Sequence, residues 1–398
     1  MPRLPQRSKR LLRLPRIQNP SPTGAGAATD AMPRLPPALP SELVEEILLR
    51  VPPQEPRSLF RSTLVCKLWL RILTGDAFRK AYRECHHGTP PMLGIFHNDR
   101  KTFYHTRFVR TLADLSPPRL GSSAFLRALD ARHGRVLFKM DADPAEDVPR
   151  KPAPHEHFLV WDPITHEGWV IPIPMPSRSI GGWFAVLCAR DGCDHLDCHG
   201  HPFRVAHAFV DEFDFNSFSA YLYSSVNGNW SDRSSVEFDG EDKDLNHFCN
   251  LHEITTNVLV GNALYFDCDL SPVIMRYGLA DRELSLIEKP DVCRYMSGQV
   301  MVENGILGFA TILGFSIYIW SREVDEHGAA AWVQPRVIKL ETLLPPRYLS
   351  TKLTMCGFAE EIGVIFLRTK PGIFTIELKS GRARNLRKDG YTHDPLPM

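Results

Sequence analysis

The last three quarters of the sequence repeat one simple unit, in which a short apolar strand is followed by a polar turn and a second strand. Five anchor residues mark these units: Trp161, Tyr223, Tyr277, Trp320 and Ile376. Successive anchors are 62, 54, 43 and 56 residues apart, and their mean of about 54 is close to the period of kelch-type propeller blades. The repeat therefore predicts a large all-β domain over residues 88–398, an irregular β-propeller, with a pair of β-sandwiches as the alternative.

Two further stretches refine this prediction. Phe125–Phe138 has a turn at His133–Gly134 and is expected to form an earlier unit, which brings the number of blades to about six. The stretch from Asn304 to Ser321 carries no charge. Because it contains glycines and β-branched residues, it predicts two buried strands with a turn near Leu313–Gly314. A spanning helix would need roughly 20 apolar residues.

Composition excludes several classes of protein. The 47 basic and 46 acidic residues give a net charge of +1, which argues against a nucleic-acid partner, because phosphate binding needs a basic excess. Nine cysteines, an odd number without any C-x-x-C pair, indicate a reducing compartment, either the cytoplasm or the nucleus. The sequence contains no phosphate-loop or dinucleotide motif, so we expect no cofactor. Because no stretch is apolar enough to span a bilayer, we also expect no membrane partner.

The N-terminal arm, residues 1–34, is rich in proline and arginine and has no apolar periodicity. We expect it to be disordered, with a targeting signal as the alternative. Its first five residues recur at positions 32–36, so translation from Met32 is also open.

Residues 35–85 predict a small helical domain. Leu43, Ile47 and Val51 form an apolar stripe with helical spacing, and Ser41 is placed to cap that helix. Glu46 and Arg50 are a favourable i,i+4 pair. A second helical run follows residue 56, and a third covers residues 65–73, where Val65, Leu68, Trp69 and Ile72 are expected to be buried. The apolar surface is too wide for so small a core, so a partner is expected to cover it.

This block resembles the F-box family. The matching positions, in order, are Leu39-Pro40, Glu42, Leu43, Ile47-Leu48, Val51-Pro52, Ser58-Leu59, Arg61, Val65-Cys66-Lys67 and Trp69. The resemblance implies a three-helix domain that docks on a Skp-type adaptor, which hangs on a cullin scaffold. It also implies which residues contact the adaptor: Leu39, Pro40, Leu43, Ile47, Leu48, Leu59, Val65, Cys66 and Trp69. Leu68 and Leu70 depart from the family pattern, which usually has polar or basic residues there.

The β-rich region resembles the C-terminal region of F-box proteins common in grasses. The resemblance is carried by residues 160–163, 191–200, 260–265, 331–334 and 374–381. It implies a substrate-binding β domain and indicates no particular substrate.

A cluster of cysteine and histidine residues is a candidate metal site. Its candidate ligands are Cys188, Cys193, Cys198, His195 and His199. Zinc accepts such ligands, but structural zinc sites usually join a close pair to a second, distant pair. We therefore expect no metal here, only buried cysteines beside a solvent-facing histidine loop.

Together, these features predict a non-catalytic, substrate-recognition subunit of a cullin-based ubiquitin ligase that binds an unknown protein target. One alternative is an enzyme on a propeller fold, with acids and histidines from several blades meeting at the central mouth. The other is an F-box protein that acts outside a ligase.

Overall fold

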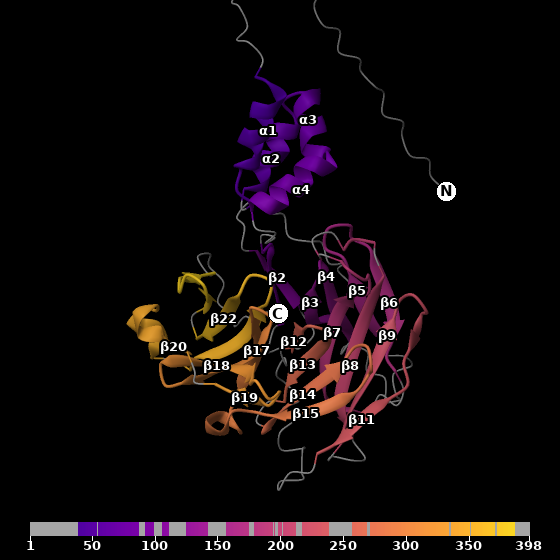
Figure 1. Cartoon of the computed structure of the whole chain (residues 1–398), viewed down its shortest axis with the longest axis vertical. Coiled ribbons are helices and arrows are strands. Elements are labelled where there is room, and N and C mark those ends of the chain that lie inside the picture. Colours follow the sequence, from indigo (N-terminus) through magenta and orange to yellow (C-terminus); the bar gives the residue numbers. More distant parts are fainter. Residues whose placement is uncertain are drawn as a thin grey trace, which may run out of the picture.

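The computed structural model of the chain shows a group of helices at one end and a β-propeller at the other (Figure 1). The described residues are 39–53, 55–86, 92–98, 106–110, 125–141, 157–174, 179–193, 195, 198–200, 202–211, 217–238, 257–268, 271–333, 336–350, 352–370 and 372–386. The expectation for the arm at residues 1–34 therefore lies outside the described residues. Within them, no helix has the length and hydropathy needed to cross a membrane.

The N-terminal unit consists of four helices around a small core. They are α1 (Ser41–Leu49), α2 (Pro56–Thr63), α3 (Lys67–Thr74) and α4 (Asp76–Cys85). The helical unit was predicted with three helices, the third over residues 65–73, and the helix α4 that follows it was not predicted. Val44, Leu48 and Phe78 are the buried residues of this core. The last helix contributes Phe78, and its Tyr82 hydroxyl donates to the Val51 carbonyl at 2.7 Å, which fixes the end of α1.

Local details of α1 partly match the sequence expectations. The Glu46–Arg50 pair is present at 2.5 Å and lies in solvent. Ser41 does not cap the helix, because it is the first helical residue and Pro40 occupies the N-cap position without a side-chain hydrogen bond. Among the residues expected to be buried in the third run, Val65 and Leu68 are 60% and 42% exposed. The small core has no room for them.

The rest of the chain forms a five-bladed β-propeller in which each blade is a four-stranded antiparallel sheet or a five-stranded variant. The first blade is β3 (Phe125–Arg132), β4 (Arg135–Asp141), β5 (His157–Trp161) and β6 (Gly168–Pro172). The second is β7 (Ser179–Cys188), β8 (Phe203–Asp211), β9 (Ser217–Ser224), β10 (Asn229–Trp230) and β11 (Ser234–Glu237). The third is β12 (Asn257–Val260), β13 (Ala263–Asp267), β14 (Val273–Gly278) and β15 (Leu284–Glu288).

The last two blades follow the same plan. The fourth is β16 (Gly298–Glu303), β17 (Ile306–Leu313), β18 (Ser316–Val324), β19 (Ala330–Trp332) and β20 (Arg336–Lys339). The fifth is β21 (Thr354–Ala359), β22 (Val364–Thr369), β23 (Gly372–Glu377) and β24 (Ala383–Asn385). A short helix, α5 (Pro346–Leu349), lies in the connection between them. The propeller prediction is therefore confirmed, and the β-sandwich alternative is wrong.

Each of the five anchor residues lies on the third strand of a different blade. The blade number of about six was wrong because the unit at Phe125–Phe138 supplies the first two strands of the blade that contains Trp161. The uncharged stretch forms β17 and β18 as expected, joined at Gly314, which has the left-handed φ of 60° that a tight turn needs.

A two-stranded hairpin closes the ring between the last blade and the first. It consists of β1 (Gly94–Asn98) and β2 (Thr106–Arg110). Neighbouring side chains of β1 point to opposite sides, so Ile95 packs with the fifth blade and Phe96 packs with the first. The Asn98 side chain also donates to the Ala128 carbonyl at 2.8 Å. The hairpin therefore takes the position that a sixth blade would occupy.

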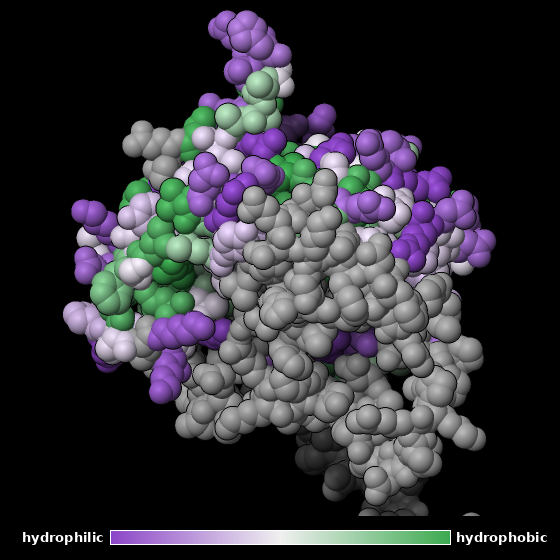
Figure 2. Space-filling model, turned by 90° about the horizontal axis from the view of Figure 1, so that it is seen from below, coloured by the Kyte–Doolittle hydropathy of each residue, from purple (hydrophilic) through white to green (hydrophobic). Residues whose placement is uncertain are grey.

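Apolar side chains fill every gap between blades. One cluster joins the first and second blades, another the second and third, and two more join the third to the fourth and the fourth to the fifth. Each blade is thus buried on both faces, which explains the near-continuous apolar runs in its strands. Figure 2 views the side away from the helices, where exposed hydrophobic residues gather in the sector that Figure 1 assigns to β18 and β20.

At the centre, a buried arginine connects four of the five blades. Arg132, at the end of β3, donates through Nε to Glu360 Oε1 at 2.6 Å and through Nη1 to Asn257 Oδ1 at 2.7 Å. Asp130 lies 3.5 Å from the same guanidinium and accepts from the backbone N–H of Val186 on β7. Burial raises the pKa of Asp130 despite the opposing charge of Arg132. Burial alone would lower the pKa of Arg132, but Glu360 and Asp130 raise it.

Replacing this arginine should destabilise the propeller strongly. In Arg132→Met, the carboxylates of Glu360 and Asp130 lose their buried counter-charge, which we expect to cost about 3–5 kcal/mol of unfolding free energy. Arg336 is the matched control because it also pairs with a glutamate, Glu303, but both side chains are about 40% exposed. Arg336→Met should cost less than about 1 kcal/mol. Urea unfolding of both variants measures the difference, and equal costs would contradict the central role of Arg132.

A second buried group, His207 on β8, has a neutral imidazole. Its ring stacks on Phe184 with centroids 4.7 Å apart, and neither ring nitrogen has a partner among the described residues. Burial, aided by the charge of Lys139, lowers the pKa of His207 from 6.5 to about 3. The folded protein therefore binds fewer protons than the unfolded chain below pH 6.5, so stability should fall as the pH drops through this window.

His207→Phe tests this linkage, because phenylalanine suits the aromatic site and cannot titrate. Between about pH 7.5 and about pH 5, we expect wild type to lose about 2 kcal/mol more unfolding free energy than the variant. His327 lies exposed in a turn, and His327→Gln serves as the control, with an acid response equal to that of wild type. Chemical denaturation at both pH values provides the measurement, and parallel pH curves for wild type and His207→Phe would contradict the argument.

Candidate functional site

The helical unit presents an unusually apolar surface to solvent. Large hydrophobic residues with more than two fifths of their area exposed occur on α1, α2, α3 and the segments beside them. They are Leu39, Leu43, Ile47, Phe60, Leu64, Val65, Leu68 and Leu70, with exposed fractions from 42% to 72%. Large hydrophobic residues exposed in this number on so small a unit favour a protein-binding surface. We call these eight residues the apolar face.

Most of the predicted adaptor contacts lie on or beside this surface. Leu39, Leu43, Ile47 and Val65 belong to the apolar face, and Pro40 and Cys66 are also exposed. Leu59 is half-buried. These residues are available to a partner as the F-box resemblance implies.

Two of the predicted contacts lie elsewhere. Leu48 is 1% exposed and belongs to the core of the helical unit, so it cannot contact a partner unless the unit opens. Trp69 is half-buried and packs against that core. The α1 stripe that faces inward therefore runs through Val44 and Leu48, whereas Leu43 and Ile47, one position earlier, face solvent. Sequence spacing alone fits both stripes equally well.

Two members of the apolar face, Phe60 and Leu64, were not among the predicted adaptor contacts, although they are 65% and 72% exposed. Leu68 was expected to be buried, and both Leu68 and Leu70 depart from the family pattern. One sequence feature could have identified all four residues. Each is a large apolar residue on a short helix or turn in which other residues already fill the core.

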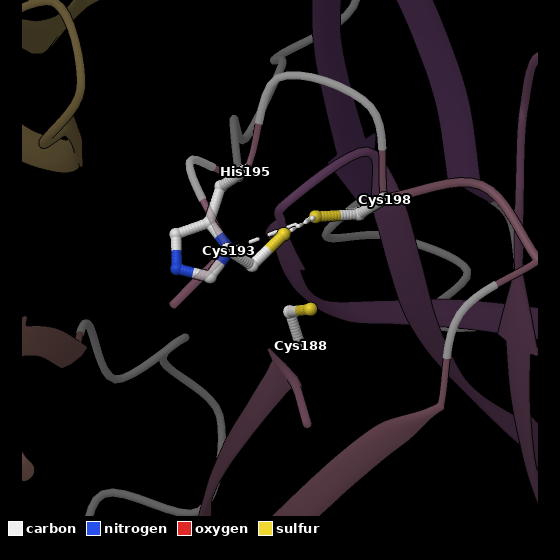
Figure 3. A group of neighbouring side chains, drawn as sticks. All are labelled: Cys188, Cys193, His195 and Cys198. Carbon is white, nitrogen blue, oxygen red and sulfur yellow. Dashed lines mark hydrogen bonds between the residues drawn. The ribbon is translucent and has the colours of Figure 1, made fainter. Parts of the chain in front are cut away.

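A second candidate site lies in the loop between β7 and β8. Cys188, the last residue of β7, meets Cys193, His195 and Cys198 from the loop, and their ligand atoms all lie within 4.8 Å of one another. Figure 3 shows Cys193, His195 and Cys198 pointing toward one another, with the Cys188 sulfur beside them. Cys193 Sγ and His195 Nδ1 each lie 3.6 Å from Cys198 Sγ. The structure therefore brings together four of the five metal candidates from the sequence.

The fifth candidate, His199, faces a different partner. Its Nδ1 makes a 2.5 Å hydrogen bond with Asp162 Oδ2, in the turn between β5 and β6. His199 thus anchors the far end of the loop to the first blade and takes no part in the cluster.

Residues of the first blade surround the four clustered side chains. The His133 ring stacks on His195 with centroids 3.7 Å apart, and its Nδ1 accepts from the Cys188 N–H. Burial, together with the charge of Arg132, lowers the pKa of His133 to about 3. Arg135 donates to the Cys198 carbonyl. Burial, with the neighbouring thiols, raises the pKa of Cys198. The eight cysteines in the described part of the chain are all free thiols.

Comparison with known proteins gives one family match. Residues 37–80 match the F-box domain. No curated protein matches the chain.

The solved structures that match this chain include distant ones. One, titled a "putative 6-phosphogluconolactonase" from Bacteroides uniformis ATCC 8492, is 12% identical with a TM-score of 0.38, over 76% of this chain and 98% of that one. Another, a functionally unknown protein from Desulfotomaculum acetoxidans DSM 771, is 10% identical with a TM-score of 0.38, over 78% of this chain and 84% of that one. Scores this low imply nothing about activity. The chain thus consists of an F-box domain at residues 37–80 followed by a five-bladed β-propeller.

Proposed function

We propose that this protein is the substrate-recognition subunit of an SCF-type cullin ubiquitin ligase. The F-box domain implies a role as a ligase substrate adaptor, and hence binding to a Skp-type protein that connects it to the cullin. The observation that carries the proposal is the apolar face, which leaves eight large hydrophobic side chains in solvent on a domain with only three buried core residues. A partner that buries this face removes the cost of its hydration.

The propeller is the part of the chain proposed to hold the protein target. Its blades pack on both faces and its centre is tied by Arg132, so its loops and outer strands project from a rigid support. The exposed hydrophobic residues of the fourth blade, among them Phe315 and Val337, offer one surface to such a target. The identity of the target is not implied by any of these features.

A non-catalytic role fits the centre of the propeller. The enzyme alternative required polar residues from several blades to converge, and Arg132, Asp130, Asn257 and Glu360 do so. Their charged and polar atoms form hydrogen bonds and ion pairs with one another. This is expected for a network that stabilises the fold and in which no group is positioned to bind a substrate. In this proposal the protein promotes ubiquitination by holding its target near the conjugating enzyme.

The proposal also includes the type of F-box protein and its cellular compartment. The stretches at residues 160–163, 191–200 and 374–381 support membership among F-box proteins of the grass type. The odd cysteine number and the free thiols support action in the cytoplasm or nucleus.

The adaptor interaction can be tested with two matched substitutions of the same residue type. Val65 lies on the apolar face and is 60% exposed, whereas Val226 lies in a propeller turn and is 70% exposed. Val65→Asp places a charge in the proposed interface and should weaken binding to a purified Skp-type adaptor by at least about 30-fold. Val226→Asp should bind as wild type does.

Binding is measured with the full-length chain by calorimetry or surface plasmon resonance, with circular dichroism as the check on folding. Failure of folded wild type to bind the adaptor would overturn the proposal. Equal binding by wild type and Val65→Asp would place the interface away from the apolar face.

A second pair of substitutions distinguishes a core residue of the helical unit from a residue of its apolar face. Leu48→Ala removes a fully buried side chain and should destabilise the unit by about 2–5 kcal/mol. Its neighbour Ile47 is 48% exposed, so Ile47→Ala should change stability by less than about 0.5 kcal/mol while weakening adaptor binding. Hydrogen exchange on the helices and adaptor titrations measure the two effects. A stable Leu48→Ala protein that fails to bind would return Leu48 to the interface.

A further inference from the structure

We propose that Cys188, Cys193, His195 and Cys198 bind one structural zinc ion, which fixes the β7–β8 loop of the second blade. Three cysteines and one histidine are a ligand set that zinc uses in closed, four-coordinate structural sites. This proposal is independent of the ligase function, because it concerns the propeller and requires no partner of the F-box.

The distances between the ligand atoms fit a common metal ion. With zinc–sulfur bonds of about 2.3 Å, two sulfurs at neighbouring corners of a tetrahedron lie about 3.8 Å apart, and a sulfur and an imidazole nitrogen lie slightly closer. The structure has Cys193 Sγ and His195 Nδ1 at 3.6 Å from Cys198 Sγ, and all four ligand atoms fall within 4.8 Å of one another. Small side-chain adjustments suffice to complete the tetrahedron.

A disulfide fits these positions less well. The sulfurs of Cys193 and Cys198 are 3.6 Å apart, whereas bonded sulfurs are separated by about 2.05 Å. A disulfide would also use only two of the four clustered residues and leave Cys188 and His195 without a role.

The backbone geometry explains why the spacing of these four residues in the sequence did not predict a metal site. Cys188 is held at the end of β7, and the chain then reverses through residues with left-handed φ values, Gly192 at 64° and His195 at 59°. Because non-glycine residues seldom adopt this conformation, its presence at His195 indicates that contacts of this side chain compensate for the strain. Three ligands within one compact loop therefore reach the strand end, with no need for a second, distant pair.

Surrounding groups hold the ligands in place. The Arg190 backbone N–H donates to Cys188 Sγ at 3.5 Å, a contact that favours a thiolate. The His133 ring stacks on His195, and Arg135 donates to the Cys198 carbonyl. Outer contacts of this kind orient first-shell ligands in metal sites. Since Cys198 is buried and all four corners come from protein, the site has no open position for a substrate.

The zinc ion would fix the β7–β8 connection of the second blade beside the first blade. The described residues of this connection, 189–193, 195, 198–200 and 202, belong to no strand or helix, and long connections of this kind are often functional in compact domains. Through His195 and Cys188, the ion would hold the loop against the His133–Gly134 turn of the first blade.

Metal content of the full-length protein provides the test. The chain is purified with a non-chelating reductant, loaded with zinc and desalted. Its zinc content is then measured by inductively coupled plasma mass spectrometry. We expect about one zinc per wild-type chain, and loss of that zinc in Cys193→Ser and in His195→Gln. Cys85→Ser and His199→Gln are the matched controls, since Cys85 lies exposed on α4 and His199 binds Asp162, and both should keep the metal.

Cobalt(II) gives a second readout that does not depend on variants. Replacement of zinc by cobalt should produce the intense visible bands of a tetrahedral site and the near-ultraviolet thiolate-to-cobalt band. Zinc should also protect Cys188, Cys193 and Cys198 from alkylation while leaving Cys66 reactive. Wild type without bound metal after loading, a Cys193–Cys198 disulfide in the reduced protein, or full zinc retention in Cys193→Ser would each overturn the proposal.

Discussion

The guanidinium of Arg132 is the interaction on which the propeller's geometry depends. A propeller has no covalent closure, so the inner strands of its blades must be held at fixed angles around the axis. Arg132 meets this need because one planar group binds Glu360 from the fifth blade, Asn257 from the third and Asp130 on its own strand. Through Asn257 and Asp130, the network also reaches backbone groups of β7 in the second blade.

The other contacts that hold neighbouring blades together are of a different kind. The fourth blade, which Arg132 does not reach, is tied to the fifth by Gln299, whose amide pairs with Gly357 O and Phe358 N when oriented to satisfy both. Besides the Arg132–Glu360 pair, the fifth blade meets the first through the β1–β2 hairpin, which inserts Ile95 on one side and Phe96 on the other. Apolar packing therefore closes the ring, while the buried charges fix how its inner strands face one another.

Sequence periodicity predicted much of this fold because one strand in each blade carries a strong signal. The third strands are apolar and largely buried, and the anchors Trp161, Tyr223 and Trp320 on them repeat visibly. The hairpin was not predicted because it lacks a third strand that would mark it as a unit. The two stripes of α1 could not be distinguished from the sequence either. Val44 and Leu48 match helical spacing as well as Leu43 and Ile47 do, and the packing of α3 and α4 decides between them.

The cysteine and histidine cluster shows a different limit, because the sequence reveals the residue types but not how the fold arranges them. Sequence spacing predicts a zinc site only when ligands come in familiar pairs, whereas coordination depends on where the chain reverses. Here the left-handed turn at His195 and the neighbouring His133 in another blade bring the ligands together. Neither a left-handed φ value nor a contact between two blades can be predicted from the spacing of residues in the sequence.

Stability is distributed unequally between the two parts of the chain, and this has a consequence for their partners. The propeller is stabilised within itself, by its interblade clusters and its central network. The helical unit has a buried core of only Val44, Leu48 and Phe78, with Trp69 and Ile72 partly buried against it and the eight residues of the apolar face exposed. A partner that binds the folded unit and not the unfolded one stabilises it by mass action. In the proposed complex, the helices are therefore expected to gain more order from the adaptor than the propeller does, because the propeller is already folded by itself and the helical unit is completed by its partner.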